Sequence, residues 1–458
     1  MRIKYFIFIL GSLFTGSVSW AQSSGQNYTI SPYSNFGLGE LLNQNFIQAG
    51  ANSQTHSGAY SFSLFNPATL GNLRYATVDF GLNGRTGNIS SGDQVRSFNG
   101  GSFSYLSLAF NNWKKDKVKS MPSSSSKKKT KTVPFAWNSA LSLYPGTSVG
   151  YNYLFESTNP FTTRTIHSGS GGVNVFELSQ SLKLGNHISL GFSSGYLFGQ
   201  IRDVSIFGFP DSTNYMFVED DKSVLIRGFQ HRAGALFSFG KDSAKHTFGL
   251  SYGFHSVVRA GQNRLVRTLE ARTLQNNLQN LYTIDTVLDI ETGMNKISMP
   301  ASFGLGYQFR FRRLFSLGLD YRKQLWGNYA AFFNPGIKLS DRTDYGVTLT
   351  LNPMDEKSVR QKRMRMPIRI GGVMSETQNA FIGTGGQRII KEQRAFVGFG
   401  IPISRRYFDN RVLRSIVHFQ ADYISRGENL NGLAREQYLV FSLSMNLGDI
   451  WFQRRKFD

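Results

Sequence analysis

The residues best suited to chemistry in this chain are two side chains near the C-terminus, His418 and Asp422. They are four residues apart in a stretch of alternating polarity, so a β-strand would place them on one face. A histidine beside a carboxylate is a common acid–base pair in enzymes and also a common ion pair. Because no nucleophile accompanies them, we interpret the two residues as an ion pair in a polar interior.

Other motifs that would identify an enzyme are missing from the sequence. The seven histidines are scattered without an HExxH spacing, and no GxSxG occurs. The chain has no cysteine, which excludes a thiol nucleophile, a disulfide framework and a zinc–thiolate site. The glycine cluster at 383–386 opens no helical pattern and predicts a hairpin tip rather than a phosphate-binding loop. We therefore expect no catalytic residues, no metal site and no cofactor.

The elements that would position any functional residue are β-strands. From Arg74 onward, apolar residues alternate with small or polar residues at a period of two, for example in Thr247–Phe254, Ser302–Phe311 and Leu439–Leu447. Charged residues make up only 17% of the chain and aromatic residues 14%. Such alternation predicts a sheet with one face toward lipid and the other toward water. A soluble β-sandwich would have shorter strands.

About 14 or 15 strand-like runs follow one another, and single-chain bacterial barrels use an even number of strands. We therefore predict an all-β fold, a transmembrane antiparallel up-and-down β-barrel of about 14 strands over residues 73–458. Barrels of about 12 and 16 strands are the alternatives. In the last run, the apolar residues would face lipid, while Ser442 and Ser444 would face the lumen.

The chain begins with features of an export signal. Arg2 and Lys4 precede an apolar run of signal-peptide length, which ends at Ser19-Trp20-Ala21. This pattern predicts a signal peptide over residues 1–21, cleaved near Ala21, and export to the outer membrane. A single-span membrane anchor is the alternative, but the apolar run is short for one.

Residues 22–72 form a second unit, polar and glycine-rich but with scattered apolar residues. Such apolar residues favour an N-terminal plug, or hatch, in the barrel lumen over a disordered tail. Near its end, Asn66-Pro67-Ala68 predicts a chain reversal, because asparagine can bind its own backbone two residues on and proline biases the preceding residue toward an extended conformation. A plain turn leading into the first strand is the alternative.

The net charge of +22 indicates which classes of partner the chain would bind. On an exported barrel it indicates contact with outer-membrane lipid and lipopolysaccharide, or with acidic partners, and we expect no nucleic acid partner. Residues 113–133 contain eight lysines and predict a solvated loop or a contact with anionic lipid. Residues 259–280 carry leucines near helical spacing and predict a long loop with a short helix.

Several segments together resemble the Bacteroidetes-type branch of the FadL outer-membrane transport family. They are SPYSNFGLGEL, FNPATLG, YPGTSVGYNYLF, ISMPASFGLGYQF, LGLDYRKQLW, MRMPIRIGGVM and MNLGDIWFQRRKFD. The most specific of these motifs is Asn66-Pro67-Ala68. The resemblance implies a 14-stranded barrel with an N-terminal hatch that passes hydrophobic molecules across the outer membrane without energy input. It also implies an inward kink in the third strand that opens the wall sideways.

Pro145-Gly146 is the candidate for that kink, because it falls inside the third strand-like run and proline cannot donate to a β-ladder. A plain turn that splits the run is the alternative. The resemblance thus predicts passive transport of small hydrophobic compounds, with a hydrophobic small molecule as ligand. The alternative is a non-transporting barrel subunit of an outer-membrane protein assembly or secretion complex.

Overall fold

The computed structural model describes residues 31–42, 47–114, 135–158, 161–209, 216–241, 243–271, 281–312, 314–331, 338–352, 366–383, 386–406, 412–429 and 433–449. The predicted signal peptide and most of the lysine-rich segment lie outside these residues. No helix in the described part of the chain is long and apolar enough to cross a membrane.

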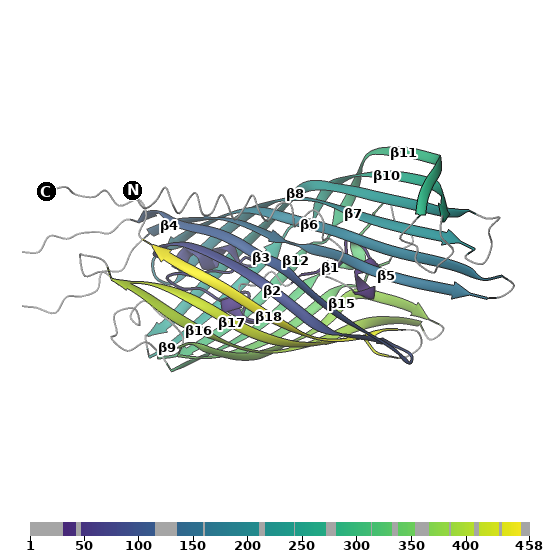
Figure 1. Cartoon of the computed structure of the whole chain (residues 1–458). Helices are drawn as coiled ribbons and strands as arrows, with labels where there is room; N and C mark the ends of the chain where they lie inside the picture. The colour runs from purple at the N-terminus through teal and green to yellow at the C-terminus, as the bar shows by residue number, and fades with distance from the viewer. Residues whose placement is uncertain are drawn as a thin grey trace, which may run out of the picture.

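Most of the described chain forms one closed antiparallel barrel (Figure 1). Neighbouring wall strands follow chain order, and β18 returns to pair with β2. Three wall strands are interrupted once each, as β4 and β5, β9 and β10, and β11 and β12, so the 17 segments from β2 to β18 make 17 − 3 = 14 wall strands. The prediction of a 14-stranded barrel is therefore confirmed.

The wall segments have the following bounds: β2 Ala76–Ser91, β3 Gln94–Lys114, β4 Phe135–Pro145, β5 Thr147–Ser157, β6 Thr163–Leu184, β7 Ile188–Gly208, β8 Phe217–Lys241, β9 Ala244–Gly253, β10 Ser256–Ala271, β11 Leu281–Met299, β12 Ser302–Phe311, β13 Phe315–Gln324, β14 Arg342–Leu351, β15 Ile368–Gly383, β16 Gly386–Arg406, β17 Val412–Arg426 and β18 Arg435–Asp449.

The two faces of the wall differ as the alternation predicts. On β18, the apolar residues Leu439, Phe441 and Leu443 are exposed on the outside, whereas Ser442 and Ser444 are buried inside. Most wall strands pair with a neighbour on each side, so most of their backbone polar groups are satisfied within the sheet. An apolar outer surface with a paired backbone can face hydrocarbon, and we treat this barrel as membrane-spanning.

Residues 259–280 differ from their prediction. The stretch from Ser256 to Ala271 is strand β10, which pairs with β8 and β11, and not a loop with a helix. Register shifts between β10 and β11 follow Ala260, Val266 and Thr268. These bulges add residues to β11 and mark a ladder with an irregular register. The prediction for residues 259–271 was wrong, and residues 272–280 lie outside the described part of the chain.

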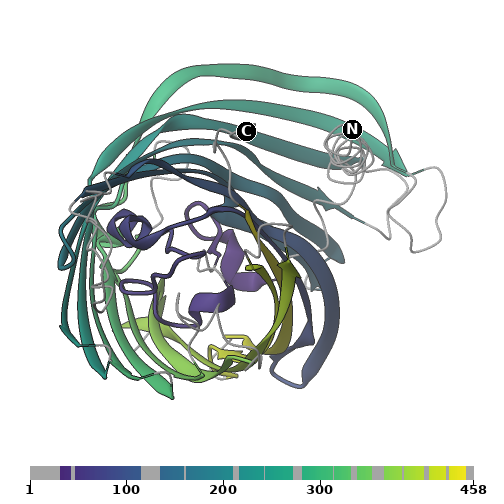
Figure 2. The ribbon, with the colours of Figure 1, turned by 90° about the vertical axis from the view of Figure 1, so that its left-hand side faces the viewer.

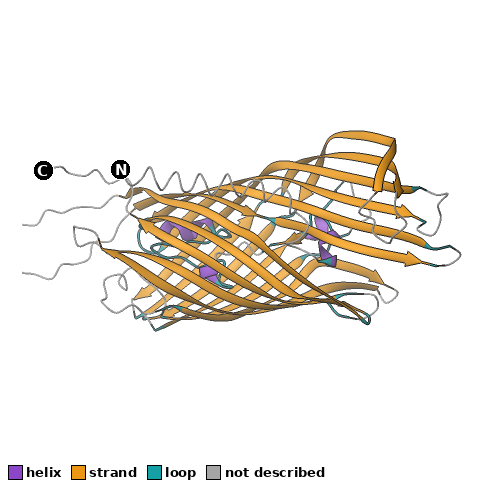
Figure 3. Cartoon of the chain, in the orientation of Figure 1, coloured by secondary structure: helices purple, strands orange, loops and turns teal. Residues whose placement is uncertain are grey.

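Residues 31–42 and 47–75 lie inside the barrel, as the view along its axis shows (Figure 2). They contain the two-residue strand β1 (Glu40–Leu41) and the 3₁₀ turns η1 (Pro32–Asn35), η2 (Ile47–Ala49) and η3 (Pro67–Asn72). A fourth described 3₁₀ turn, η5 (Trp326–Asn328), follows β13 (Figure 3). The apolar side chains of this N-terminal segment are buried against the inner face of the wall.

The wall is uneven in height. We call the rim where β2 begins and β18 ends the near rim, and the opposite one the far rim. At the far rim, β5, β6, β7, β8, β10 and β11 extend beyond the other strands and form what we call the tall sheet (Figures 1 and 2). The tall sheet ends at β11, because the next wall strand, β13, pairs with β12 and not with β11.

Candidate functional site

The third wall strand is broken at the two residues singled out in the sequence. β4 ends at Pro145 and β5 begins at Thr147, so Gly146 lies between them. β4 pairs with both β3 and β6, whereas β5 pairs with β6 and not with β3. Residues 94–105 of β3 therefore lack a wall strand on this side among the described residues. The wall opens sideways between β3 and β5, and we call this gap the lateral opening.

Glycines allow β5 to leave the line of the wall. Gly171 and Gly172 of β6 have φ angles of +106° and +151°, in a region that side chains rarely allow. A Cβ atom on Gly172 would lie 2.3 Å from the carbonyl oxygen of Thr147. A Cβ atom on Gly199 of β7 would lie 2.1 Å from the carbonyl oxygen of Gly172. The backbones of β5, β6 and β7 therefore approach one another here more closely than residues with a side chain would permit.

N-terminal residues 31–42 lie beside β5, in the position that β3 would occupy in an unbroken wall. β1 pairs antiparallel with Thr147–Ser148. The backbone N–H of Ser31 donates to the carbonyl oxygen of Gly150 at 2.8 Å. The segment thus extends β5 with its own backbone and sits in the lateral opening.

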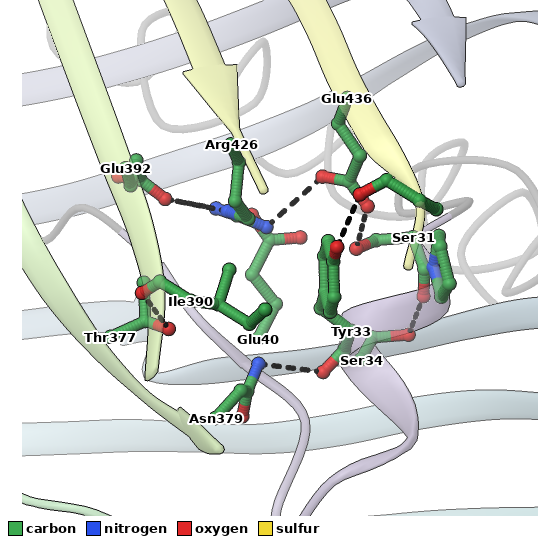
Figure 4. A network of polar contacts seen from close by, with 12 residues as sticks. Ser31, Tyr33, Ser34, Glu40, Thr377, Asn379, Ile390, Glu392, Arg426 and Glu436 are labelled. Carbon is green, nitrogen blue, oxygen red and sulfur yellow. Dashed lines mark hydrogen bonds and ion pairs between the residues drawn. The ribbon is translucent and has the colours of Figure 1, made fainter. Parts of the chain in front are cut away.

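Glu40 fastens the same segment to the opposite side of the opening (Figure 4). Its Oε1 lies 2.7 Å from Nη2 of Arg426 on β17, and its Oε2 lies 3.4 Å from Nη1 of Arg85 on β2. Arg426 also binds Glu392 of β16 at 2.5 Å and Glu436 of β18 at 3.4 Å. We call these five residues the latch cluster. Through Glu40, the segment joins β5 to β2 and β17 across the lateral opening.

The two arginines of the latch cluster keep Glu40 charged. Burial alone would raise the pKa of Glu40, but the guanidinium groups of Arg426 and Arg85 outweigh it and lower the pKa to about 2. The carboxylate is therefore ionised at neutral pH. Because an ionised group without its partner is costly to bury, the cluster holds the segment in place.

Two cavities flank the segment, and Leu41 lines both. The outer cavity, of about 160 Å³, reaches Phe103 at the edge of β3 and is lined by four residues of the latch cluster together with apolar residues such as Phe65. The inner cavity, of about 90 Å³, lies against the inside of the tall sheet and includes Val175, Leu197 and Trp326 beside the ion pair of Glu177 and Arg232. Residues 38–42 therefore separate a cavity at the lateral opening from a second cavity inside the barrel.

The predicted hatch motif Asn66-Pro67-Ala68 forms the start of η3. Asn66 is extended, with φ −127° and ψ 99°, and its Oδ1 accepts a hydrogen bond from the N–H of Ala68 at 3.1 Å. Its Nδ2 donates to the carbonyl oxygens of Gln54 at 2.8 Å and of Ala235 on β8 at 3.2 Å. One side chain therefore caps the turn and ties it to the wall. The structure does not bring this motif to Pro145-Gly146, because the two contact different parts of the lumen.

Glycines on the inner face of the wall receive the N-terminal segment. A Cβ atom on Gly234 would lie 2.1 Å from Oδ1 of Asn66, and one on Gly191 would lie 2.3 Å from the backbone nitrogen of Ala68. Gly304 and Gly306 of β12 lie under Gln54 in the same way. The small residues that the sequence places on the polar face are thus a contact surface. This part of the lumen is filled by protein.

His418 and Asp422 both lie on the inner face but do not form the expected ion pair. Asp422 binds Arg394, with Oδ1 at 2.6 Å from Nη2, and the ring nitrogen Nδ1 of His418 lies 3.2 Å from Nη1 of Arg369. Gln420 lies between them on the same strand face and donates to Asp422. That expectation was wrong because each group has a partner on another strand, Arg394 on β16 for Asp422 and Arg369 on β15 for His418. No group of three metal-ligating side chains gathers among the described residues.

Sequence reasoning missed the latch cluster. A signal was present, since Glu40 is the single charged residue between residues 22 and 73 apart from His56. An isolated carboxylate in an otherwise uncharged segment that packs inside a lumen needs a cationic partner. The sequence did not indicate that the partners would be Arg85 and Arg426, which lie far along the chain.

Comparisons with known proteins agree with this architecture. The chain is similar to a monoaromatic hydrocarbon channel, CymD, at 13% identity and a TM-score of 0.53 over 91% of this chain and 99% of that one. A Pseudomonas aeruginosa FadL homologue matches at 13% identity and a TM-score of 0.51, over 89% and 99% of the two chains. The Ralstonia pickettii toluene transporter TbuX matches at 11% identity and a TM-score of 0.51, over 88% of this chain and 98% of that one. At these identities the likeness establishes the fold.

Similarity at the level of sequence is more specific. No curated protein matches the chain. The family model described as BamG matches residues 2–127 and 130–458, which is nearly the whole sequence. The chain therefore belongs to the BamG family, and its barrel has the FadL-type fold.

Proposed function

We propose that this barrel lies in the outer membrane and provides a passive lateral route for small hydrophobic compounds, with residues 31–42 as its gate. The observation that carries the proposal is the partition at Leu41. On one side of this residue a cavity reaches the lateral opening, and on the other side lies a second cavity inside the barrel. Moving residues 38–42 away from β5 would join the two.

The substrate class follows from the lining and the size of the inner cavity. Val175, Leu197 and Trp326 offer apolar contact, and a volume of about 90 Å³ suits only a small molecule before the gate moves. Two proteins with the same fold are described as a monoaromatic hydrocarbon channel and a toluene transporter. A small apolar or monoaromatic compound is therefore the ligand class that we propose for this chain.

A reversible crosslink tests the gate directly. The chain has no cysteine, so an introduced pair will be the only one. Leu41 and Thr147 are direct antiparallel partners, a geometry that a disulfide can bridge. With Leu41→Cys and Thr147→Cys, oxidation should reduce uptake of the apolar fluorophore N-phenyl-1-naphthylamine to that of cells without the protein. Reduction should restore uptake.

The matched control is the pair Ser238→Cys and Thr247→Cys, two buried partners on β8 and β9 that line neither cavity. Oxidation of this pair should leave uptake unchanged. Equal uptake by the oxidised and reduced gate pair, above the level of cells without the protein, would show that residues 31–42 are not the gate. No uptake above that level in either state would refute transport itself.

A second candidate function is a non-transporting barrel subunit of an outer-membrane protein assembly or secretion complex. The observation that favours it is the fixed content of the lumen, where buried ion pairs and closely fitted glycines hold the N-terminal segment. A barrel whose interior never rearranges would serve as a rigid body for partners. Purification in mild detergent separates the two candidates, because a subunit should retain partner proteins at fixed stoichiometry.

A further inference from the structure

The tall sheet ends at an edge strand, β11, which among the described residues is paired on one side only for most of its length. β11 pairs with β10 on one side. On its other side the only described contact of this kind is the bridge from Ser298 to Ala330, at the end of the strand where the tall sheet joins the barrel. Figure 1 shows the β10–β11 hairpin beyond the far rim, and Figure 2 shows it at the outer margin of the sheet.

This edge exposes large apolar side chains in a cluster. Tyr282, Ile284, Val287, Ile290 and Met294 are exposed by about half, from 46% to 63%. Three of them, Ile284, Val287 and Met294, lie at the register shifts, where β11 has a residue more than β10. Exposed apolar patches at a sheet edge mark interaction sites. Bulges at three places also interrupt a continuous ladder, so contact here would be made by side chains rather than by strand addition.

The charges on β11 argue against lipid as the occupant. The strand carries three exposed acidic residues, Asp285, Asp289 and Glu291, and one lysine, Lys296. Two of the three arginines on β10 are already paired, because Arg264 binds Asp220 and Arg267 binds Glu219 on β8. The third, Arg259, lies opposite Lys296 and away from the three acidic residues. Anionic lipopolysaccharide would be repelled by such an edge, and hydrocarbon would not accept three carboxylates.

The same charges disfavour a second copy of this chain. Two identical β11 edges related by a two-fold axis would bring carboxylates against carboxylates. A chain with a net charge of +22 thus presents an acidic and apolar edge at the margin of the tall sheet. Electrostatic complementarity selects a partner of opposite sign.

We propose that the β11 edge of the tall sheet binds a different protein at the far rim, through a surface that is apolar and carries lysine or arginine. This inference does not rest on the proposed transport function, since the edge lies outside the barrel lumen. It supplies the contact surface that a subunit of a larger assembly would need.

Site-specific crosslinking in cells tests the proposal. A photoreactive benzoylphenylalanine at Val287 should yield a discrete protein adduct whose crosslinked peptide contains lysine or arginine. The triple variant Asp285→Lys, Asp289→Lys and Glu291→Lys should reduce that adduct by about tenfold, because like charges now face each other. The variant Val287→Ser, made separately with the photoreactive group at Ile290, should reduce it through lost apolar contact.

The matched control position is Val95, which is exposed by 66% on β3 at the far rim. Its adduct yield should be low, and Asp93→Lys, a charge reversal beside it, should leave the Val287 adduct unchanged. A heat-modifiable folded band on a gel confirms that each variant has assembled. Adducts only with lipopolysaccharide, only with another copy of the chain, or insensitive to the charge reversal would each overturn the proposal.

Discussion

Replacing Glu40 by glutamine should loosen the N-terminal segment without unfolding the barrel. The carboxylate of Glu40 is buried and binds Arg426 and Arg85, at 2.7 Å and 3.4 Å. Glutamine keeps the size of the side chain and part of its hydrogen bonding but loses the charge. Arg426 keeps Glu392 and Glu436, so the loss falls short of an entire buried ion pair.

A hydrogen bond to a charged group contributes about 1.5–3 kcal/mol, and we take about 2 kcal/mol as the cost of Glu40→Gln. That cost corresponds to roughly a 30-fold change in the equilibrium between docked and undocked segment. Hydrogen exchange of residues 38–42 measures it, because in this stretch the backbone N–H of Leu42 donates to the carbonyl oxygen of Gly146 and exchanges only when the segment leaves the wall.

The control variant is Glu156→Gln, which removes the charge from an ion pair with Arg164 whose carboxylate is 45% exposed. Exposed ion pairs contribute little, so exchange of residues 38–42 should stay as in the unaltered chain. If Glu40→Gln changes their exchange no more than Glu156→Gln does, the latch cluster does not hold the segment and the reasoning is refuted.

Three further predictions concern the docking of the segment and the faces of the wall. The pKa of Glu40 falls from its ordinary value of 4.5 to about 2 in the docked segment. The contribution of Glu40 to docking should therefore be complete above about pH 4.5 and lost as the pH falls toward 2. Hydrogen exchange, corrected for its intrinsic pH dependence, should show this loss in the unaltered chain and not in Glu40→Gln. Asn66→Ala removes the cap of η3 and two hydrogen bonds to Gln54 and Ala235, so it should destabilise the docked segment by about 1–3 kcal/mol, and unchanged exchange in residues 62–73 would contradict this. Leu443→Arg on the lipid face should destabilise the membrane-inserted barrel by about 2–4 kcal/mol and reduce the heat-modifiable folded band on a gel. Ser442→Arg, whose side chain enters the outer cavity, should assemble. Equal yields of folded protein would mean that the two faces are misassigned.

The choice of Ser442 as the lumen control comes from the structure. From the sequence alone, Ser444 is an equally good lumen position. In the structure Ser444 is completely buried, whereas Ser442 lines a cavity. The sequence pattern assigns a face to each residue of a strand, but it does not show how much space lies in front of that face.

The barrel could be predicted because lipid imposes a strict pattern on its outer face. In β12 the apolar residues alternate with small and polar ones without interruption, and its bounds agree with the predicted run Ser302–Phe311. Where lipid does not constrain the chain, the pattern fails. β10 was taken for a loop, because its outer part belongs to the tall sheet and carries arginines that bind acidic residues of β8.

The latch cluster could not be predicted because it depends on contacts between distant parts of the chain. Glu40 and Arg426 are 386 residues apart, and four wall strands contribute to the cluster. The break at Pro145-Gly146 could be anticipated from the chemistry of proline, but its partner, β1, could not. Two residues of strand carry too little pattern to be distinguished from a loop.

The central claim is that the N-terminal segment closes the barrel, and ion conductance tests it most directly. Residues 22–64 would be deleted behind an intact signal, and the purified protein would be inserted into a planar bilayer. The structure predicts a folded barrel that conducts ions, because removing this segment empties the space over Gly304 and Gly306 and beside β5, while the full-length protein stays nearly closed. A deleted protein that folds and remains closed would contradict the claim, and with it the proposal that residues 31–42 gate a route through the wall.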